Sequence, residues 1–145
     1  MPKRMLITGA GSGFGKGAAV ELAARGHEVF ATTETVAQAE ALSVEHPELT
    51  AVKLDVTDSG DVARVAEIDP DVLINNAGFG VMAPLAHVPL ERLKAGFDVN
   101  VFGMVAVTQA AIPGMKAKGA GRVINMSSVA GVLSGPMTAP YAMTK

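Results

Sequence analysis

A glycine-rich stretch near the start of the chain has the residue types needed to hold a phosphate group. It follows the apolar run Met5-Leu6-Ile7 and reads Thr8-Gly9-Ala10-Gly11-Ser12-Gly13-Phe14-Gly15. Glycine allows a sharp turn and a close approach of the backbone to a ligand because it has no Cβ atom. A helix that starts near Gly13 would direct its free N–H groups and the positive end of its dipole at the ligand. The stretch therefore predicts a cradle for a diphosphate.

Two other glycine-rich phosphate motifs do not fit this stretch. A Walker loop requires Ser or Thr after its lysine, but Gly17 follows Lys16, and Ala10 takes the place of the first glycine. The G-x-G-x-x-G pattern fails as well, because Phe14 and Lys16 stand where glycines are needed. An ordinary packing turn remains the alternative, although the position after the first apolar run favours ligand binding.

Tyr141 and Lys145 could together move a proton. They are four residues apart, so on a helix they would share a face. A phenol is a weak acid at neutral pH, and a neighbouring ammonium group favours its deprotonated form. Taken singly, Tyr141 is an ordinary half-buried tyrosine, Ser128 a helix cap or loop residue, and Asn100 a buried hydrogen-bonding residue.

Short apolar runs alternate with longer, alanine-rich amphipathic segments along the chain. We expect strands at residues 5–8, 28–32, 49–54, 72–74 and 122–126, and helices at residues 13–25, 36–45, 61–67 and 90–118. Strands separated by helices are typical of a parallel sheet covered on both faces. The sequence thus predicts one α/β domain, a doubly wound and mostly parallel sheet over residues 1–145.

Composition limits the classes of function. The 145 residues are 49% hydrophobic, enough for one domain with a sizeable core. The net charge of −2 gives no electrostatic reason to expect a nucleic-acid partner. The absence of cysteine excludes disulfides and thiolate chemistry, and the three histidines lack ligand-like spacing, so we expect no metal site.

Neither a signal peptide nor a membrane span is predicted. The apolar run after the basic residues 1–4 is too short for a signal peptide. The uncharged residues 99–115 fall short of the roughly 20 apolar residues of a membrane span. We expect a buried helix there, a cytoplasmic protein and no membrane partner.

Six motifs, in register along the whole chain, resemble those of the short-chain dehydrogenase/reductase family. They are Thr8-Gly9-x-x-x-Gly13-x-Gly15, Asp55-Val56, Asn75-Asn76-Ala77-Gly78, Asn100, Ser127-Ser128 and Tyr141-x-x-x-Lys145. The resemblance implies a Rossmann-like fold that binds NAD(H) or NADP(H). It also implies hydride transfer between that cofactor and an alcohol or ketone.

The same resemblance implies catalytic positions. Tyr141 would exchange a proton with the substrate oxygen, and Lys145 would also hold the nicotinamide ribose. Ser128 would donate a hydrogen bond to the substrate oxygen, where charge changes during the reaction. Asn100 resembles the residue that holds a water in the family's proton relay.

Further cofactor contacts are implied after the third and fourth strands. Asp55 would accept a hydrogen bond from the adenine amino group, and the backbone N–H of Val56 would donate one. The alternative for Asp55 is a helix cap, which Asp58 or Ser59 could provide instead. Asn76, Ala77 and Gly78 would line the ribose and nicotinamide side, whereas Asn75 would brace the sheet.

The choice of cofactor depends on the end of the second strand. An acid there selects NAD through the ribose 2′-hydroxyl, and a nearby Arg accommodates the 2′-phosphate of NADP. We expect the neutral Thr32 at that position, with Glu34 beside it to repel a phosphate, and no Lys or Arg lies between residues 28 and 49. Ser12 and Thr33 could still bind a phosphate, so the sequence favours NAD(H) without excluding NADP(H).

The substrate and the extent of the chain are further expectations. Met82, Met137 and Met143 lie in or beside loops that contact substrate in this family, which favours an apolar alcohol or ketone; methionine as a core filler is the alternative. Because the family's fold continues beyond Lys145, we expect the N-terminal portion of a longer, homo-oligomeric enzyme, poorly active by itself.

Two other functions remain open at this stage. One is a dinucleotide-binding module without catalysis. The other is a nucleotide-sugar epimerase or dehydratase, which is less favoured because those proteins space their glycines differently and usually lack Asn-Asn-Ala-Gly.

Overall fold

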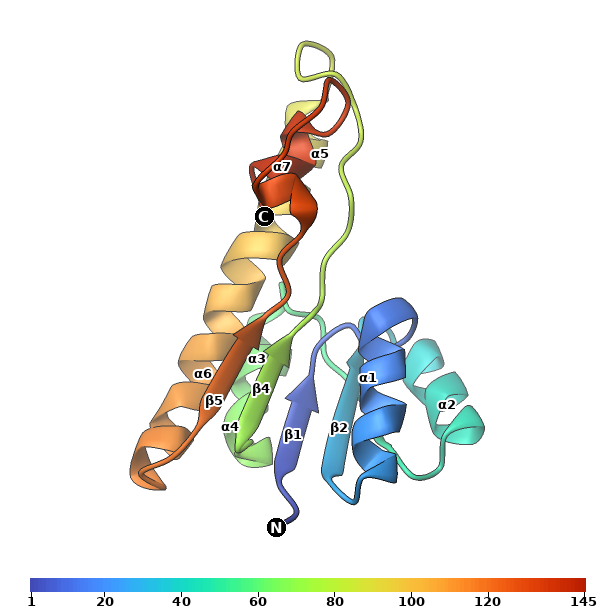
Figure 1. The fold of residues 1–145 in the computed structure, drawn as a ribbon, viewed down its shortest axis with the longest axis vertical. Coiled ribbons are helices and arrows are strands. Elements are labelled where there is room, and N and C mark those ends of the chain that lie inside the picture. Colours follow the sequence, from blue (N-terminus) through green and yellow to red (C-terminus); the bar gives the residue numbers. More distant parts are fainter.

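A parallel sheet of five strands forms the centre of the computed structural model, which describes residues 1–145 (Figure 1). The strands are β1 (Arg4–Ile7), β2 (Glu28–Thr33), β3 (Thr50–Lys53), β4 (Val72–Asn75) and β5 (Arg122–Asn125). Their order is β3-β2-β1-β4-β5, and every neighbouring pair is parallel. The predicted doubly wound α/β fold is confirmed, and each predicted strand is correct to within one residue at either end.

Helices cover both faces of the sheet. They are α1 (Gly13–Ala24), α2 (Val36–Glu45), α3 (Ser59–Ala63), α4 (Val65–Ile68), α5 (Leu90–Phe97), α6 (Met104–Ala117) and α7 (Ala139–Ala142). Two hydrophobic clusters fill the layers between helices and sheet. One joins β1 and β2 to α1 and α2, with Ile7 and Ala19 fully buried. The other joins β1 and β4 to α4 and α6, with Leu73 and Val107 fully buried.

Two predicted helices differ in detail from those observed. The segment predicted as one helix at residues 61–67 forms α3 and α4, and α3 begins earlier because the Asp58 carboxylate accepts the N–H of Asp61 at 2.8 Å. The long predicted helix is continuous, but a π-helix at Asp98–Gly103 separates α5 from α6. Such π-helical turns are rare and frequently lie at functional sites.

The continuous helix Leu90–Ala117 is long and apolar enough to cross a membrane by length and composition alone, with a mean hydropathy of 1.3 over its most apolar 18-residue window. Only 28% of that window is buried. Its inner face packs in the second cluster through Val107, Ala111 and Met115. The predicted helix is therefore present, but burial is confined to this inner face.

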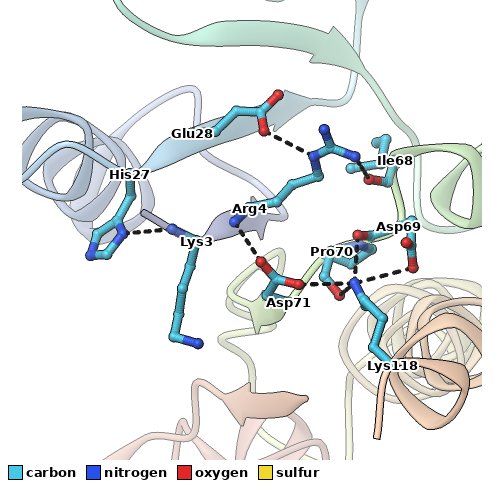
Figure 2. Close-up of polar contacts among 9 residues, drawn as sticks. All are labelled: Lys3, Arg4, His27, Glu28, Ile68, Asp69, Pro70, Asp71 and Lys118. Atoms are coloured by element: carbon cyan, nitrogen blue, oxygen red, sulfur yellow. Dashed lines mark hydrogen bonds and ion pairs between the residues drawn. The ribbon is translucent and has the colours of Figure 1, made fainter. Parts of the chain in front are cut away.

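At the amino ends of the strands, charged side chains tie the layers together (Figure 2). The Arg4 N–H donates to the Asp71 carboxylate at 2.9 Å, and Lys118 Nζ donates to the same carboxylate at 2.9 Å. These bonds hold the pKa of Asp71 below its ordinary value, the Arg4 N–H having the largest effect and Lys118 the next. The contacts join β1, β4 and the end of α6 at the edge of the sheet opposite the glycine-rich turn.

Strand order reverses between β1 and β4, because the chain extends the sheet to one side of β1 and then returns to the other. In doubly wound sheets, ligands bind in the crevice at the carboxyl ends of the strands at such a reversal. In Figure 1, α5, α7 and the C-terminus stand beyond these carboxyl ends. The fold therefore brings the glycine-rich turn and the Tyr141 segment to the same edge of the sheet.

Candidate active site

The glycine-rich turn between β1 and α1 requires glycine for its shape. Gly9 and Gly13 have positive φ angles of 65° and 56°. A Cβ atom on Gly9 would lie 2.7 Å from Ala77 Cα, so this turn and the chain after β4 are in close contact. Ser12 is the N-cap residue of α1, yet its side chain makes no capping hydrogen bond. The turn thus presents a helix N-terminus and a hydroxyl group available to an anion.

Asn76, the residue after β4, holds the glycine-rich turn in place through hydrogen bonds. Its Nδ2 atom donates to the carbonyl oxygens of Thr8 and Gly9 at 3.0 and 2.9 Å. The Thr8 hydroxyl in return accepts the backbone N–H groups of Asn76 and Ala77, both at 3.0 Å. A Cβ on Gly15 would meet Asn76 Nδ2 and would lie 2.7 Å from the Gly9 oxygen. Gly13 and Gly15 therefore shape the turn without lining the cavity above it.

A cavity of about 720 Å³ lies at the carboxyl ends of all five strands. The predicted site residues that line it are Gly9, Gly11, Ser12, Phe14, Glu34, Asp55, Val56, Asn76, Ala77, Gly78, Ser128, Tyr141 and Lys145. Residues that line it without having been predicted include Gln38, Phe79, Met126 and Val129. One elongated cavity thus joins the glycine-rich turn to Tyr141.

The residue at the end of β2 that reaches the cavity is Thr33, and the expectation for Thr32 was wrong by one position. Thr32 is fully buried, and its hydroxyl has no hydrogen-bond partner. Successive side chains of a strand point to opposite faces, so only one of the two threonines faces the cavity. Thr33 lines it together with Glu34 and donates its hydroxyl proton to the Thr35 oxygen at 3.0 Å.

Tyr141 and Lys145 lie together although no single helix contains both. Helix α7 ends at Ala142, and the chain continues as a turn in which the Lys145 N–H donates to the Ala142 oxygen at 3.2 Å. Lys145 Nζ lies 5.8 Å from the centre of the Tyr141 ring and donates to the Met126 oxygen at 3.2 Å. The ammonium group is thereby held beside the phenol.

Two serines after β5 take different positions. Ser128 lines the cavity and is the N-cap residue of a short 3-10 helix, where its hydroxyl oxygen accepts the Ala130 N–H at 3.2 Å. The Ser128 hydroxyl proton is left to donate to a ligand. Ser127 instead donates its hydroxyl proton to the backbone oxygen of Lys145 at 3.1 Å, which anchors the end of the Tyr141 segment.

Asn100 does not line the cavity. It lies buried in the π-helix, where its Oδ1 accepts the Phe79 N–H at 3.0 Å and its Nδ2 donates to the Phe79 oxygen at 3.0 Å. The same Nδ2 donates to the Thr144 hydroxyl at 2.9 Å. Because both N–H groups are engaged, the Asn100 amide braces the site and has no N–H left for the expected water.

Thr144 is a site residue that the sequence did not reveal. It is 7% exposed, accepts from Asn100 and donates its hydroxyl proton to the backbone carbonyl oxygen of Tyr141 at 2.8 Å. No local pattern marks it, because its partner Asn100 is 44 positions away.

Of the other residues given a role from the sequence, Asn75 lies as predicted and the three methionines do not. Asn75 braces the sheet as predicted, because its Nδ2 donates to Thr108 and Asn125 at 2.8 and 2.9 Å. The three methionines expected near substrate, Met82, Met137 and Met143, are about half exposed and do not line the main cavity. No group of three or more His, Asp or Glu side chains is arranged to hold a metal ion.

Comparison with known proteins identifies the family. A family model described as short chain dehydrogenase matches residues 3–145. The chain belongs to the short-chain dehydrogenase family. It is 39% identical to a 2-keto-3-deoxy-L-fuconate dehydrogenase of Xanthomonas campestris, with 99% of this chain and 49% of that protein aligned. It is 37% identical to human 17-beta-hydroxysteroid dehydrogenase type 1, with 97% and 47% aligned.

Solved structures of other short-chain dehydrogenases share the fold. The closed form of a serine dehydrogenase complexed with NADP+ superposes with a TM-score of 0.90 at 30% identity, covering 97% of this chain and 60% of that one. This short-chain dehydrogenase chain spans about half the length of the curated relatives it matches.

The cavity fits a nicotinamide dinucleotide, the cofactor of this dehydrogenase family. The glycine-rich turn lines one end of the cavity, and Ser12 offers a hydroxyl that makes no capping hydrogen bond. The cavity extends from that turn to Tyr141, so a two-part ligand could bind at both ends. Asp55 also lines the cavity, with one carboxylate oxygen, Oδ1, bound to Thr57.

Proposed function

We propose that this protein is an NAD(P)-dependent oxidoreductase that interconverts an alcohol and a ketone. The observation that carries the proposal is the position of Tyr141 and Lys145 in the same cavity as the glycine-rich turn. Bound at that turn, the nicotinamide dinucleotide would supply or accept the hydride.

The chain's own residues would then bind the cofactor and move the proton. The N–H groups at the start of α1 and the Ser12 hydroxyl would hold the diphosphate. The phenol of Tyr141 would give its proton to the substrate oxygen during reduction and take it back during oxidation. The Lys145 ammonium lies beside the Tyr141 ring, and the free Ser128 hydroxyl proton would stabilise charge on the substrate oxygen.

We further propose a preference for NAD(H). Glu34 lies exposed beside Thr33 at the end of β2, where its carboxylate would repel a 2′-phosphate. The Thr33 hydroxyl proton is already donated to a backbone oxygen. Lys145 is the only Lys or Arg that lines the cavity, and it lies beside Tyr141 rather than beside Glu34. The similar serine dehydrogenase structure is a complex with NADP+, so the alternative cofactor is NADP(H).

The substrate is proposed to be an apolar alcohol or ketone. Phe79, Met126 and Val129 line the same cavity as Tyr141 and are exposed. The names of the two relatives include a sugar-acid substrate and a steroid, so the preference rests on these side chains.

A homo-oligomer is proposed from the outer face of the long helix. Leu90, Phe102 and Val105 are exposed there, and a second copy of the chain would remove them from water. Analytical ultracentrifugation measures the oligomeric state directly.

The experiment that tests the proposed function combines binding and turnover. NADH fluorescence is titrated against the protein, and absorbance in the nicotinamide band is then followed with a panel of aliphatic and cyclic ketones. Saturable binding with oxidation of NADH by at least one ketone supports the proposal. Absence of dinucleotide binding would contradict it.

A further inference from the structure

Asp61, on α3, lies directly behind the turn that follows β3. Its Oδ2 atom accepts the backbone N–H of Asp55 at 2.7 Å and forms an ion pair with Lys53. The Asp61 side chain is only 12% exposed. One carboxylate oxygen therefore binds both the Lys53 ammonium group and the Asp55 N–H, on either side of Leu54 at the end of β3.

The position of Asp61 is itself fixed by the fold. Its own N–H donates to the Asp58 carboxylate at 2.8 Å in the cap of α3. The intervening Leu54 is buried in the core, and its N–H donates to the Thr33 oxygen at 2.8 Å. The last residue of β3, Leu54 and Asp55 are thus held by β2 on one side and by Asp61 on the other.

Asp55 and Val56 line the cavity, whereas Asp61 does not. The Asp55 Oδ1 atom accepts the Thr57 N–H at 2.9 Å and the Thr57 hydroxyl at 2.7 Å. These bonds set the direction of the Asp55 carboxylate and leave Oδ2 for a ligand. The backbone from which the carboxylate extends is set by Asp61.

The charge of Asp61 suits this position. Burial acts to raise the pKa of Asp61, but the hydrogen bonds from Lys53 and from the Asp55 N–H outweigh it and hold the pKa below the ordinary value. The carboxylate is therefore ionised at neutral pH, and hydrogen bonds to charged groups are stronger than those between neutral groups.

We propose that Asp61 is a positioning residue for recognition of the adenine base. Through the Asp55 N–H, it holds the Asp55-Val56 segment in place to contact the cofactor. The inference rests on the proposed function, because it requires a bound dinucleotide. It concerns the choice of base rather than hydride transfer, so binding measurements test it without turnover.

The experiment compares two dinucleotides that differ only in the base. NADH carries the adenine amino group, and reduced nicotinamide hypoxanthine dinucleotide lacks it. In the wild-type protein we expect tighter binding of NADH, measured by nicotinamide fluorescence. In Asp61→Ala we expect NADH affinity to fall about tenfold, the size of one lost hydrogen bond to a charged group. Affinity for the hypoxanthine dinucleotide should fall less, so the ratio of the affinity for NADH to that for the hypoxanthine dinucleotide should decrease.

Two further variants separate positioning from general damage. Asp61→Asn keeps an oxygen to accept the Asp55 N–H and should restore most of the preference. Glu67→Ala removes an exposed acid from the neighbouring α4 and should leave both affinities unchanged. If Asp61→Ala left the ratio of the two affinities unchanged, whether neither affinity fell or both fell equally, the inference would be overturned.

Hydrogen exchange keeps the inference testable if Asp61→Ala does not fold. The Asp55 amide of the wild-type protein should exchange slowly, because its N–H is held by Asp61. Fast exchange of that amide would overturn the inference. Failure of the wild-type protein to bind either dinucleotide would instead contradict the proposed function.

Discussion

The side-chain amide of Asn100 donates a hydrogen bond of 2.9 Å to the hydroxyl of Thr144 and thereby joins the π-helix to the segment that carries Tyr141. The same hydroxyl donates to the backbone carbonyl oxygen of Tyr141 at 2.8 Å. Both side chains are buried, so these bonds are shielded from water. The backbone of Tyr141 is thus held by two residues that do not line the cavity.

Replacing Thr144 with valine should destabilise this region. Valine has nearly the same shape but leaves an Asn100 N–H without its acceptor, which costs about 1–3 kcal/mol for a buried group. Thr144→Ser retains the hydroxyl and should be close to wild type. Because the chain has one tyrosine and no tryptophan, tyrosine fluorescence during denaturant unfolding reports on Tyr141 alone. Equal stability of the valine and serine variants would contradict this assignment.

Gly9→Ala should weaken dinucleotide binding by at least about tenfold. Alanine at a positive φ costs about 1–2 kcal/mol, and its Cβ would collide with Ala77 in the structure. Gly17→Ala is the matched control in α1, because a Cβ there meets nothing within 4 Å. That control should bind NADH normally and be more stable by about 0.5–1 kcal/mol. NADH titration and thermal unfolding of both variants measure these effects.

Glu34→Gln should raise affinity for NADPH by about fivefold while affecting NADH little. Removing one exposed charge near the 2′-phosphate changes the interaction energy by about 1 kcal/mol, and salt should reduce the effect. Glu40→Gln, an exposed acid further along α2, serves as the control. Competitive titration of the two cofactors gives the ratio. An unchanged ratio would argue against Glu34 as a determinant of cofactor choice.

The charged cluster at the amino ends of the strands predicts a dependence of stability on pH. Because the pKa of Asp71 is lowered in the folded state, its ionisation stabilises the fold above the ordinary carboxyl pKa. This contribution is lost as the pH falls below about 4, towards the folded-state value. Asp71→Asn should therefore be less stable at neutral pH and should lose less stability on acidification. Denaturant unfolding at several pH values measures both slopes.

Local patterns predicted the strands, most helices and the place of the cofactor turn. The alternation of apolar runs with amphipathic segments gave β1 to β5, since buried parallel strands must be short and apolar. Gly9 and Gly15 stand where the structure has no room for a Cβ, so their residue types already indicated the turn. The fold class therefore followed from the sequence.

The errors and omissions have tertiary causes. The assignment of Thr32 in place of Thr33 was wrong because β2 ends at Thr33, one residue later than predicted. Successive side chains of a strand point to opposite faces, so this shift brings Thr33 to the cavity in place of Thr32. The bond between Asn100 and Thr144, and the contact of Asp61 with Asp55, depend on how helices approach the sheet. Neither has a periodicity that a single sequence displays.

We propose that Tyr141 exchanges a proton with the substrate, while the dinucleotide binds independently of the Tyr141 hydroxyl. Tyr141→Phe tests this most directly, because it removes one hydroxyl and leaves the ring beside Lys145. NADH affinity and ketone-dependent oxidation of NADH are measured on the same preparation of the full-length protein. We expect NADH binding to stay within about twofold of wild type while turnover falls by at least about a hundredfold. Wild-type turnover in Tyr141→Phe would contradict it.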